Sequence, residues 1–435
     1  MSFPAYPEYK DSGVGWLGEI PAGWEPRKFR FLFAESAEKI DDTVVGPMLA
    51  VSGYRGIEVK EYEDDNQRRS DDDLVGYRIV RPGQLVVNTM WLNYTGLGVS
   101  EHEGHVSPAY RSYDISESLD RRFVHYIMRS SIHVDAYTRL LQGIRPNSLQ
   151  MSRADLMDFP VLVPPADDQR AIAAFLDRET AKIDAAVAAQ ERLIALLAEK
   201  RAATISHAVT KGLDPDAPMK DSGIEWLGQI PAHWSTPAIS HVCDEIGSGT
   251  TPSTNDEQAY GGEVCWVTTG ELRETGIYST RKRLTEAALA NYSALKKFSP
   301  GTLLIAMYGA TIGRLGWLEC EAATNQACCA MRTSEPDLGR FLFYVLQGGK
   351  PALILLGSGG GQPNISQEKV RQFRFALPSH EEQKTIIAYL DNACSRIDAL
   401  KAKALSSIRL LKERRAALIS AAVTGKIDVR GDVDE

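Results

Sequence analysis

Apolar residues recur at helical spacing over two long stretches of the chain, residues 164–214 and 378–428. In each stretch they fall mostly three, four, or seven to eight positions apart, which leaves one narrow apolar stripe on a 3.6-residue period. At 1.5 Å per residue, about 40 helical residues would form a helix roughly 60 Å long. The two series are Ile172, Leu176, Ile183, Val187, Ile194, Leu197 and Ile205, and then Ile386, Leu390, Ile397, Ile408, Leu411 and Ile419.

The two stretches are copies of one another at an offset of 214 residues, and nearly half of their aligned positions are identical. Each begins after a proline with acidic residues in the first turn, and a glycine stands where each helix should end (Gly212 and Gly425). A helix with so narrow a stripe is not stable alone. We therefore expect the two copies to bury their stripes against each other. The alternative is that each helix packs on its own domain.

A second repeat precedes each of the two intervening regions. Residues 10–24 read KDSGVGWLGEIPAGW and residues 220–234 read KDSGIEWLGQIPAHW. Asp-Ser-Gly favours a turn, and the large apolar groups that follow need a surface to bury against. Because no catalytic set of residues is present here, we interpret both segments as structural clasps.

The intervening regions contain the same order of elements in different sequences. Pro82 and Pro300 each open a turn and a strand, residues 121–140 and 339–356 are predicted amphipathic helices, and a polar loop follows each helix. The predicted fold is α+β, with two mixed α/β domains separated by two long helices that form an antiparallel coiled coil. The predicted domains are residues 1–163 (clasp and first domain), 164–214 (first long helix), 215–377 (second clasp and second domain) and 378–435 (second long helix and tail).

Composition narrows the class of protein. The chain has 435 residues, of which 43% are apolar, and no run of about 18 apolar residues that would predict a membrane span. No secretory signal is recognisable at the N-terminus. The six cysteines form no CxxC pair and have no metal-binding spacing with histidines. We expect free thiols and a cytoplasmic protein.

The net charge of −8 argues against a nucleic-acid-binding protein, because neutralising phosphates requires Lys and Arg. Counted separately, residues 25–163 carry about −4 and residues 235–377 about zero. Any contact with DNA must therefore use a local patch or be completed by a partner protein.

Motifs for catalysis are missing from the sequence. There is no GxxxxGK[ST] phosphate loop, no dinucleotide fingerprint, no GxSxG elbow and no HExxH, and the eight histidines are scattered. No Asn-Pro-Pro-Tyr motif for adenine methylation occurs. We expect a recognition or scaffold protein that is not an enzyme and binds no metal.

Several segments in combination resemble the specificity subunit of type I restriction–modification systems. They are the KDSGxxWLGxIPxxW clasps, the PxxxxQxxIxxxLD openings of the long helices, and the related helix ends at residues 200–214 and 414–428. Phrases within the domains resemble that family's DNA-reading domains as well: residues 266–269, 306–313, 324–327 and 361–366, and in the first domain 99–110 and 142–145.

The resemblance implies that each domain is a target recognition domain for one half of a bipartite, asymmetric site on double-stranded DNA. The long helices would pair antiparallel, set the gap between the half-sites and dock two modification (methyltransferase) subunits, which restriction (endonuclease and translocase) subunits would join. This chain would hold no cofactor, whereas S-adenosylmethionine, ATP and Mg would act in the partner subunits.

Candidate DNA-binding residues follow from the polar and aromatic side chains in the turn after each strand and the loop after each helix. Each residue alone is equally consistent with a structural turn, so the clusters carry the prediction. They are Asn88, Trp91, Asn93, Tyr94, Arg145 and Asn147 in the first domain, and Thr250, Thr251, Tyr308, Thr311, Arg314, Gln362 and Asn364 in the second. For the docking of partners we single out the small residues Ala185, Ala188, Ala189 and Ala195, which are equally explained by helix propensity.

Two alternatives remain open. The chain could be the specificity subunit of a type II-like fused restriction–methylation enzyme, which neighbouring genes would distinguish. It could also be a protein scaffold with two adaptor domains on a coiled coil, which the charge balance favours slightly.

Overall fold

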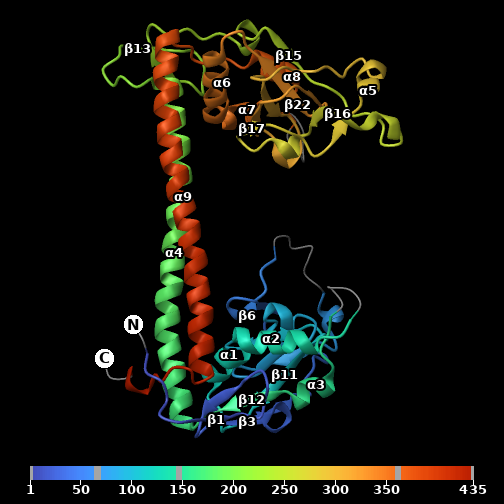
Figure 1. The fold of residues 1–435 in the computed structure, drawn as a ribbon, viewed down its shortest axis with the longest axis vertical. Coiled ribbons are helices and arrows are strands. Elements are labelled where there is room, and N and C mark those ends of the chain that lie inside the picture. Colours follow the sequence, from blue (N-terminus) through green and yellow to red (C-terminus); the bar gives the residue numbers. More distant parts are fainter. Residues whose placement is uncertain (1–2, 63–69, 144–148, 358–363, 433–435) are drawn as a thin grey trace. The chain divides into compact units, whose positions relative to one another are not determined.

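The computed structural model describes residues 3–62, 70–143, 149–357 and 364–432. These residues form two compact units (Figure 1). The first comprises residues 1–191 with 405–435, and the second comprises residues 192–404. Each of the two long helices therefore begins in one unit and ends in the other.

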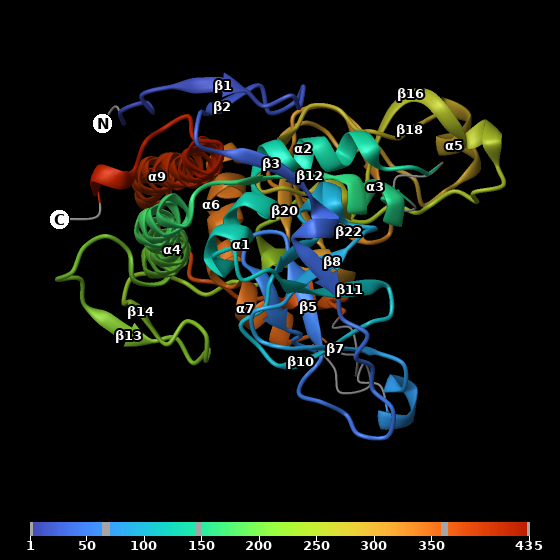
Figure 2. The same cartoon turned by 90° about the horizontal axis from the view of Figure 1, so that it is seen from below.

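The long helices are α4 (Ala166–Lys211) and α9 (His380–Val423), and they pack side by side (Figures 1 and 2). In the first unit, Ile172 at the start of α4 shares a core with Ile419 near the end of α9. In the second unit, Ile205 near the end of α4 shares a core with Ile386 at the start of α9. The helices are thus antiparallel, and the prediction that the two stripes bury each other is confirmed.

Two equivalent ion pairs fix this antiparallel register. In the first unit, Arg415 Nε lies 3.0 Å from Asp184 Oδ1. In the second unit, Arg201 Nε lies 3.8 Å from Asp398 Oδ1. Both residues of one pair are 214 positions from their counterparts in the other, which is the offset of the sequence repeat. The duplication therefore extends from the sequence to individual contacts of the paired helices.

The first unit is built on a four-stranded antiparallel sheet with strand order β4-β11-β8-β9. Three two-stranded pairs, β3-β12, β5-β6 and β7-β10, and three helices complete the domain, and β1-β2 forms the clasp. The bounds are β1 Tyr9–Asp11, β2 Glu19–Pro21, β3 Glu25–Lys28, β4 Phe33–Glu35, β5 Leu49–Ser52, β6 Gly56–Val59, β7 Arg78–Val80, β8 Leu85–Asn88, β9 Leu97–Val99, β10 Gly104–Val106, β11 Tyr110–Ile115, α1 Arg121–Arg129, α2 Ser131–Leu140, α3 Arg153–Asp158 and β12 Pro160–Val163.

The second unit has a five-stranded sheet with order β15-β22-β19-β20-β17 and a three-stranded sheet with order β18-β16-β21. Its clasp is β13-β14. The bounds are β13 Met219–Asp221, β14 Gln229–Pro231, β15 Glu245–Gly247, β16 Tyr260–Val267, β17 Gly276–Ile277, β18 Arg283–Leu284, α5 Glu286–Asn291, β19 Leu303–Ala306, β20 Leu315–Leu318, β21 Ala322–Thr324, β22 Cys328–Arg332, α6 Pro336–Gly348, α7 Lys350–Leu355 and α8 Gln367–Gln372.

Both clasps bury their second tryptophan against the start of a long helix. Trp24 is 1% exposed, and its indole Nε1 donates to Asp168 Oδ2 at 2.9 Å. Trp234 is 2% exposed, and its Nε1 donates to Glu382 Oε1 at 3.2 Å. In Figure 2, β1 and β2 lie beside α9, and β13 and β14 lie beside α4. Both repeats thus pack on the start of a long helix, as expected of a structural clasp.

The prediction of one continuous helix in each domain was wrong, because both helices break at equivalent places. Ser130 separates α1 from α2 with an extended backbone (ψ 147°), and its hydroxyl donates to the Ile127 carbonyl at 2.8 Å. Gly349 separates α6 from α7, and a Cβ there would lie 2.8 Å from the Phe373 ring. A serine that competes for a helix carbonyl and a glycine required by close packing both end a helix.

Among the described residues, no helix is both long enough and apolar enough to cross a membrane. All six cysteines are free thiols, and the adjacent Cys328 and Cys329 are buried in β22. Burial raises the pKa of each of these two thiols to about 12, so both stay protonated at neutral pH. These two residues therefore belong to the core.

We expect Trp24→Phe to destabilise the chain more than Trp234→Phe. Trp24 binds a carboxylate that is only 6% exposed, and loss of such a hydrogen bond costs about 1.5–3 kcal/mol. The Glu382 side chain is 38% exposed, so water can replace the Trp234 bond, and the loss should stay below about 1 kcal/mol. Urea unfolding followed by circular dichroism measures both. Equal losses would show that ring packing, rather than the buried hydrogen bond, sets the stability of the clasps.

Candidate nucleic-acid interface

In each domain, a short connection joins two antiparallel strands of the main sheet. These two connections are called the first turn and the second turn. The first turn, residues 88–96, joins β8 to β9, and the second turn, residues 306–314, joins β19 to β20. The two turns occupy equivalent places, since β8 pairs with β11, the strand before α1, and β19 pairs with β22, the strand before α6. Together they contain seven of the thirteen predicted DNA-binding residues.

The first turn exposes two large aromatic rings on a fixed backbone. Trp91 is 57% exposed and Tyr94 is 60% exposed, and their rings form an edge-to-face pair with centroids 5.9 Å apart. Between them Leu92 is fully buried and anchors the turn. Thr95, which follows Tyr94, has a φ of 59°, a left-handed conformation that is uncommon outside glycine. Exposed aromatic surface held on a rigid turn is typical of a binding site.

The two asparagines of the first turn lie deeper than the aromatic rings. Asn88 is 7% exposed, and its side-chain oxygen accepts from the Met90 N–H at 3.1 Å, so it shapes the turn. The side-chain oxygen of Asn93 is buried and has no hydrogen-bond partner among the described residues. Contact with DNA at either position stays a prediction.

The C-terminal end of the loop after α2, at residues 150–151, is held against the first turn. The Met151 N–H donates to the Thr89 carbonyl at 3.1 Å, and Gln150 Nε2 donates to Thr89 Oγ1 at 3.2 Å. Gln142 and Gln150 bridge the two ends of the loop. The predicted Arg145 and Asn147 lie between those ends, outside the described residues. Thr89 and Gln150 were missed in the sequence, although both flank predicted residues.

The second turn carries a different set of side chains. Tyr308 is 38% exposed, Arg314 is exposed, and Thr311 Oγ1 donates to the Tyr308 carbonyl at 3.3 Å. Gly309 and Gly313 supply positive φ angles of 69° and 72° on either side of Thr311. In the described part of the chain, Arg314 has no ion-pair partner within 4 Å. Its guanidinium is therefore available to a ligand.

Neighbouring loops bring more of the predicted residues to the second turn. Thr251 Oγ1 donates to Gln326 Oε1 at 2.7 Å, and the Thr250 carbonyl accepts from Trp266 Nε1 at 3.3 Å. Asn364 is exposed, and the Ile365 N–H beside it donates to the Met307 carbonyl at 2.9 Å. The predicted Gln362 lies outside the described residues.

The bond from the Ile365 N–H to the Met307 carbonyl is the counterpart of the bond from the Met151 N–H to the Thr89 carbonyl in the first domain. Met151 and Ile365 are 214 residues apart, as are the repeated helices. Each is followed by a serine whose hydroxyl caps the next short helix, Ser152 for α3 and Ser366 for α8. The two domains therefore position turn and loop by the same backbone contacts while changing the side chains that they present.

A basic segment beside the second turn was also missed. Residues 281–283 are three consecutive cations, and Tyr278 just before them is 74% exposed. The Glu271 carboxylate accepts from the backbone N–H of Thr268 and of Arg281, which ties this segment to the strand end that contacts Asn325. The run of three cations in a domain of zero net charge was the signal in the sequence.

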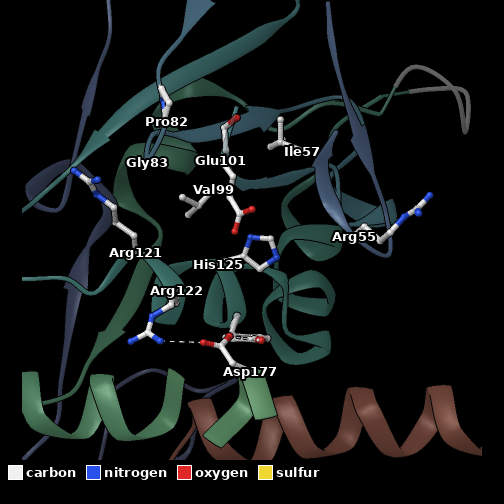
Figure 3. Close-up of a pocket in the computed structure, with 12 residues that line it drawn as sticks. Arg55, Ile57, Pro82, Gly83, Val99, Glu101, Arg121, Arg122, His125 and Asp177 are labelled. Carbon is white, nitrogen blue, oxygen red and sulfur yellow. Dashed lines mark hydrogen bonds and ion pairs between the residues drawn. The ribbon is translucent and has the colours of Figure 1, made fainter. Parts of the chain in front are cut away.

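Polar contacts lock each domain to the first half of a long helix. Arg122 Nη1 lies 3.0 Å from Asp177 Oδ2, and the Tyr126 hydroxyl donates to the same carboxylate at 2.8 Å. Arg340 and Tyr344 contact Asp391 in the same way, at 2.7 and 2.6 Å. Figure 3 shows the Arg122–Asp177 pair below the cavity of about 430 Å³ that it helps to line.

His125 and Asp177, two titratable residues that line this cavity, have structural roles. His125, which points into the cavity in Figure 3, is neutral at pH 7 because burial and the nearby Arg129 charge lower its pKa to about 3. The carboxylate of Asp177 is already bound by Arg122 and Tyr126. Among the described residues, no group of three or more His, Cys, Asp or Glu side chains is placed to hold a metal ion.

Comparison with known proteins agrees with this arrangement. Residues 231–409 match the family model described as type I restriction modification DNA specificity domain. The MjaIX type I restriction enzyme specificity subunit of Methanocaldococcus jannaschii is 28% identical over 174 residues, which are 38% of this chain and 40% of that protein. The MjaX protein of the same organism, assigned as a type I restriction enzyme specificity subunit, is 20% identical over 95% of this chain and 96% of its own length.

Solved structures share the fold. A chain from a study of complex assembly and conformational transition of the type I R-M system superposes with a TM-score of 0.71 at 18% identity, covering 94% of this chain and 99% of that one. The HsdS subunit from Thermoanaerobacter tengcongensis gives a TM-score of 0.50 at 16% identity, covering 94% and 98%. Residues 231–409 therefore match a DNA specificity domain of type I restriction–modification systems, and the chain as a whole has the fold of such a specificity subunit.

Proposed function

We propose that the chain reads a bipartite, asymmetric site on double-stranded DNA, one half with each domain. The observation that carries this proposal is the pair of equivalent turns: identical backbone contacts place them, yet one presents Trp91 and Tyr94 and the other Tyr308 and Arg314. Two unlike surfaces on a duplicated framework are suited to two unlike half-sites, much as the geometry of dimeric DNA-binding proteins sets half-site spacing.

The side chains of the turns suit base recognition. An arginine can bind O6 and N7 of guanine with both guanidinium nitrogens, and asparagine or glutamine can bind adenine in the same way. Arg314, Asn364 and the exposed Gln150 offer these groups, and Trp91 with Tyr94 offers apolar surface for thymine methyl groups or for an opened base step. Arg281 and Lys282 supply charge for phosphates.

Partner subunits complete the proposed function. Modification subunits would dock on the outward faces of the long helices, where Ala185, Ala188, Ala189 and Ala195 are all exposed. Small residues there allow another helix to approach closely. Restriction subunits would join that assembly, and methyl transfer and ATP-driven cleavage would take place in the partners. A chain of net charge −8 needs these partners to supply part of the grip on phosphates.

Methylome sequencing of cells that carry this chain with its modification subunit tests the proposal directly. We expect one methylated motif with two unlike halves and a fixed gap. Replacing residues 25–163 by the same domain of a relative should change one half of the motif only. A swap that leaves the methylated sequence unchanged and alters the bound proteins would instead indicate a protein scaffold.

We expect Arg314→Ala to weaken recognition of one half-site by about 1–3 kcal/mol and to leave the other half-site unaffected. The measurement is the methylation rate of the complex on DNA with single-base changes in either half. Arg332→Ala is the matched control, because Arg332 is an exposed arginine at the opposite end of the same sheet, where β22 pairs with the start of β19. Equal losses at both halves would contradict two independent reading domains.

The isolated chain should bind its site weakly at physiological salt, and addition of the modification subunits should tighten binding by at least tenfold, on the order of 1.4 kcal/mol. Fluorescence anisotropy with labelled duplex over a salt series measures both. The logarithmic salt slope should become steeper in the complex, since the partners add phosphate contacts. Tight, specific binding by the isolated chain would refute this division of labour.

A further inference from the structure

The backbone of the first turn rests on residues 52–54, the end of β5 and the start of the loop that leads to β6. A Cβ at Gly53 would lie 2.9 Å from the Tyr94 carbonyl oxygen, so only glycine lets this loop approach so closely. The contact falls directly after the exposed aromatic pair and directly before the left-handed residue Thr95. A shift of the loop would therefore shift the turn.

Arg129, the last residue of α1, clamps loop and turn together through four backbone carbonyls. Its Nη2 donates to the Ser52 carbonyl at 3.2 Å and to the Gly53 carbonyl at 3.0 Å, and its Nη1 donates to the carbonyls of Leu97 and, at 3.4 Å, Thr95. Burial and the charge of Arg415 lower its pKa to about 10, which still leaves it charged at pH 7. No carboxylate of the described residues forms an ion pair with it, so its charge is balanced by the carbonyl dipoles that it orders.

The same loop continues to the paired helices. The Tyr54 hydroxyl donates to the Asp184 carboxylate on α4, and Arg415 of α9 binds that carboxylate at 3.0 Å. The Arg415 guanidinium also lies over the Tyr54 ring, 4.6 Å from its centroid. A continuous series of polar contacts thus leads from the first turn through Arg129 and residues 52–54 to the ion pair of the long helices.

In the second domain, a similar series of contacts leads from the second turn to the ion pair of the long helices. It is made by different side chains. The backbone of Glu274 donates to the Leu315 carbonyl at 2.8 Å, and its Oε1 accepts from the Leu315 N–H at 3.3 Å, directly after Arg314. Its Oε2 accepts from Gln347 Nε2 at 3.3 Å. Gln347 Oε1 in turn accepts from Arg201 Nη1 at 2.8 Å, and Arg201 pairs with Asp398.

Several features indicate that these contacts are a maintained part of the fold and not chance neighbours. Arg201 and Asp398 are the counterparts of Arg415 and Asp184 in the sequence repeat. Glu274 has a φ of 59°, a conformation that costs a non-glycine residue energy and persists only where surrounding contacts maintain it. Burial raises the pKa of its carboxyl group, and three cations nearby oppose that rise.

We propose that Arg129 and Glu274 are positioning residues for DNA reading: each fixes one turn relative to the long helices and so sets base discrimination at its own half-site without contacting DNA. The proposal rests on the function proposed above. Base recognition needs side chains held within about 0.5 Å of their working position, and a turn loses that accuracy when its support is removed. The fold can tolerate the same loss, because both residues lie at the margin of their cores.

The test compares substituted chains in the reconstituted complex with modification subunits. Arg129→Gln places at this position the amide that Gln347 supplies in the second domain. Gly53→Ala disturbs the same turn without removing a charge. For each, the methylation rate is measured on the motif and on single-base variants of either half. We expect the ratio of cognate to variant rates to fall roughly tenfold at the first half-site, a typical single-contact effect, with no change at the second.

The reciprocal variant is Glu274→Gly, which removes the carboxylate and keeps the positive φ accessible. It should lower discrimination at the second half-site only. Arg121→Gln is the matched control, because it removes an exposed arginine of the same helix α1 that takes no part in the contacts described above. It should leave both ratios unchanged.

The outcomes are distinguishable. Rates that fall equally on all substrates, with unchanged ratios, would reduce Arg129 and Glu274 to stabilising residues and overturn the proposal. A fall of both ratios in every variant would do the same. An unsubstituted complex that methylates without any half-site preference would refute the proposed function itself.

Discussion

The mutual burial of two narrow apolar stripes is the constraint on which the rest of the structure depends. Each long helix gains most of its stability from the packing of its narrow stripe of large apolar side chains, not from helix propensity alone. Antiparallel pairing satisfies both stripes at once, and Arg415 with Asp184 and Arg201 with Asp398 fix the register. Once the helices are paired, the start of one lies beside the end of the other. Each clasp can then pack on the start of one helix and the end of the other, and each domain packs on the same pair of helix ends.

Duplication explains how one chain can carry two different surfaces without two different frameworks. The contacts that repeat are those that position elements: the clasp tryptophans on Asp168 and Glu382, and the domain helices on Asp177 and Asp391. The two turns, in contrast, carry different residues. Because the positioning contacts are made by backbone groups and by side chains outside the turns, the turn residues can change while the fold stays the same. This separation is what a family of recognition proteins needs if new specificities are to arise by local substitution.

Much of the framework could be predicted from the sequence, because periodicity and repetition are local signals. The long helices, the clasps and the equivalence of the two domains all followed from them. The break of residues 121–140 at Ser130 did not. The hydrogen bonds of Ser130 are local, but its partner His133 is buried against Trp16 and Phe159, which are distant in the sequence. Asn88 looked like an exposed turn residue and is buried, because burial is decided by strands distant in the sequence. Arg129 gave no signal at all: its partners are backbone carbonyls, which every residue has.

The acidic net charge is compatible with DNA recognition once the ionic contacts are assigned. Many of the arginines, including Arg122, Arg340 and Arg415, are bound to carboxylates that hold the domains and helices together. Their charge is already neutralised, and so is that of their acidic partners. What a DNA phosphate would meet is the remaining local charge, such as Arg314, Arg281 and Lys282, and not the sum over 435 residues. The net charge of the whole chain therefore says little about which ligands the turns can bind.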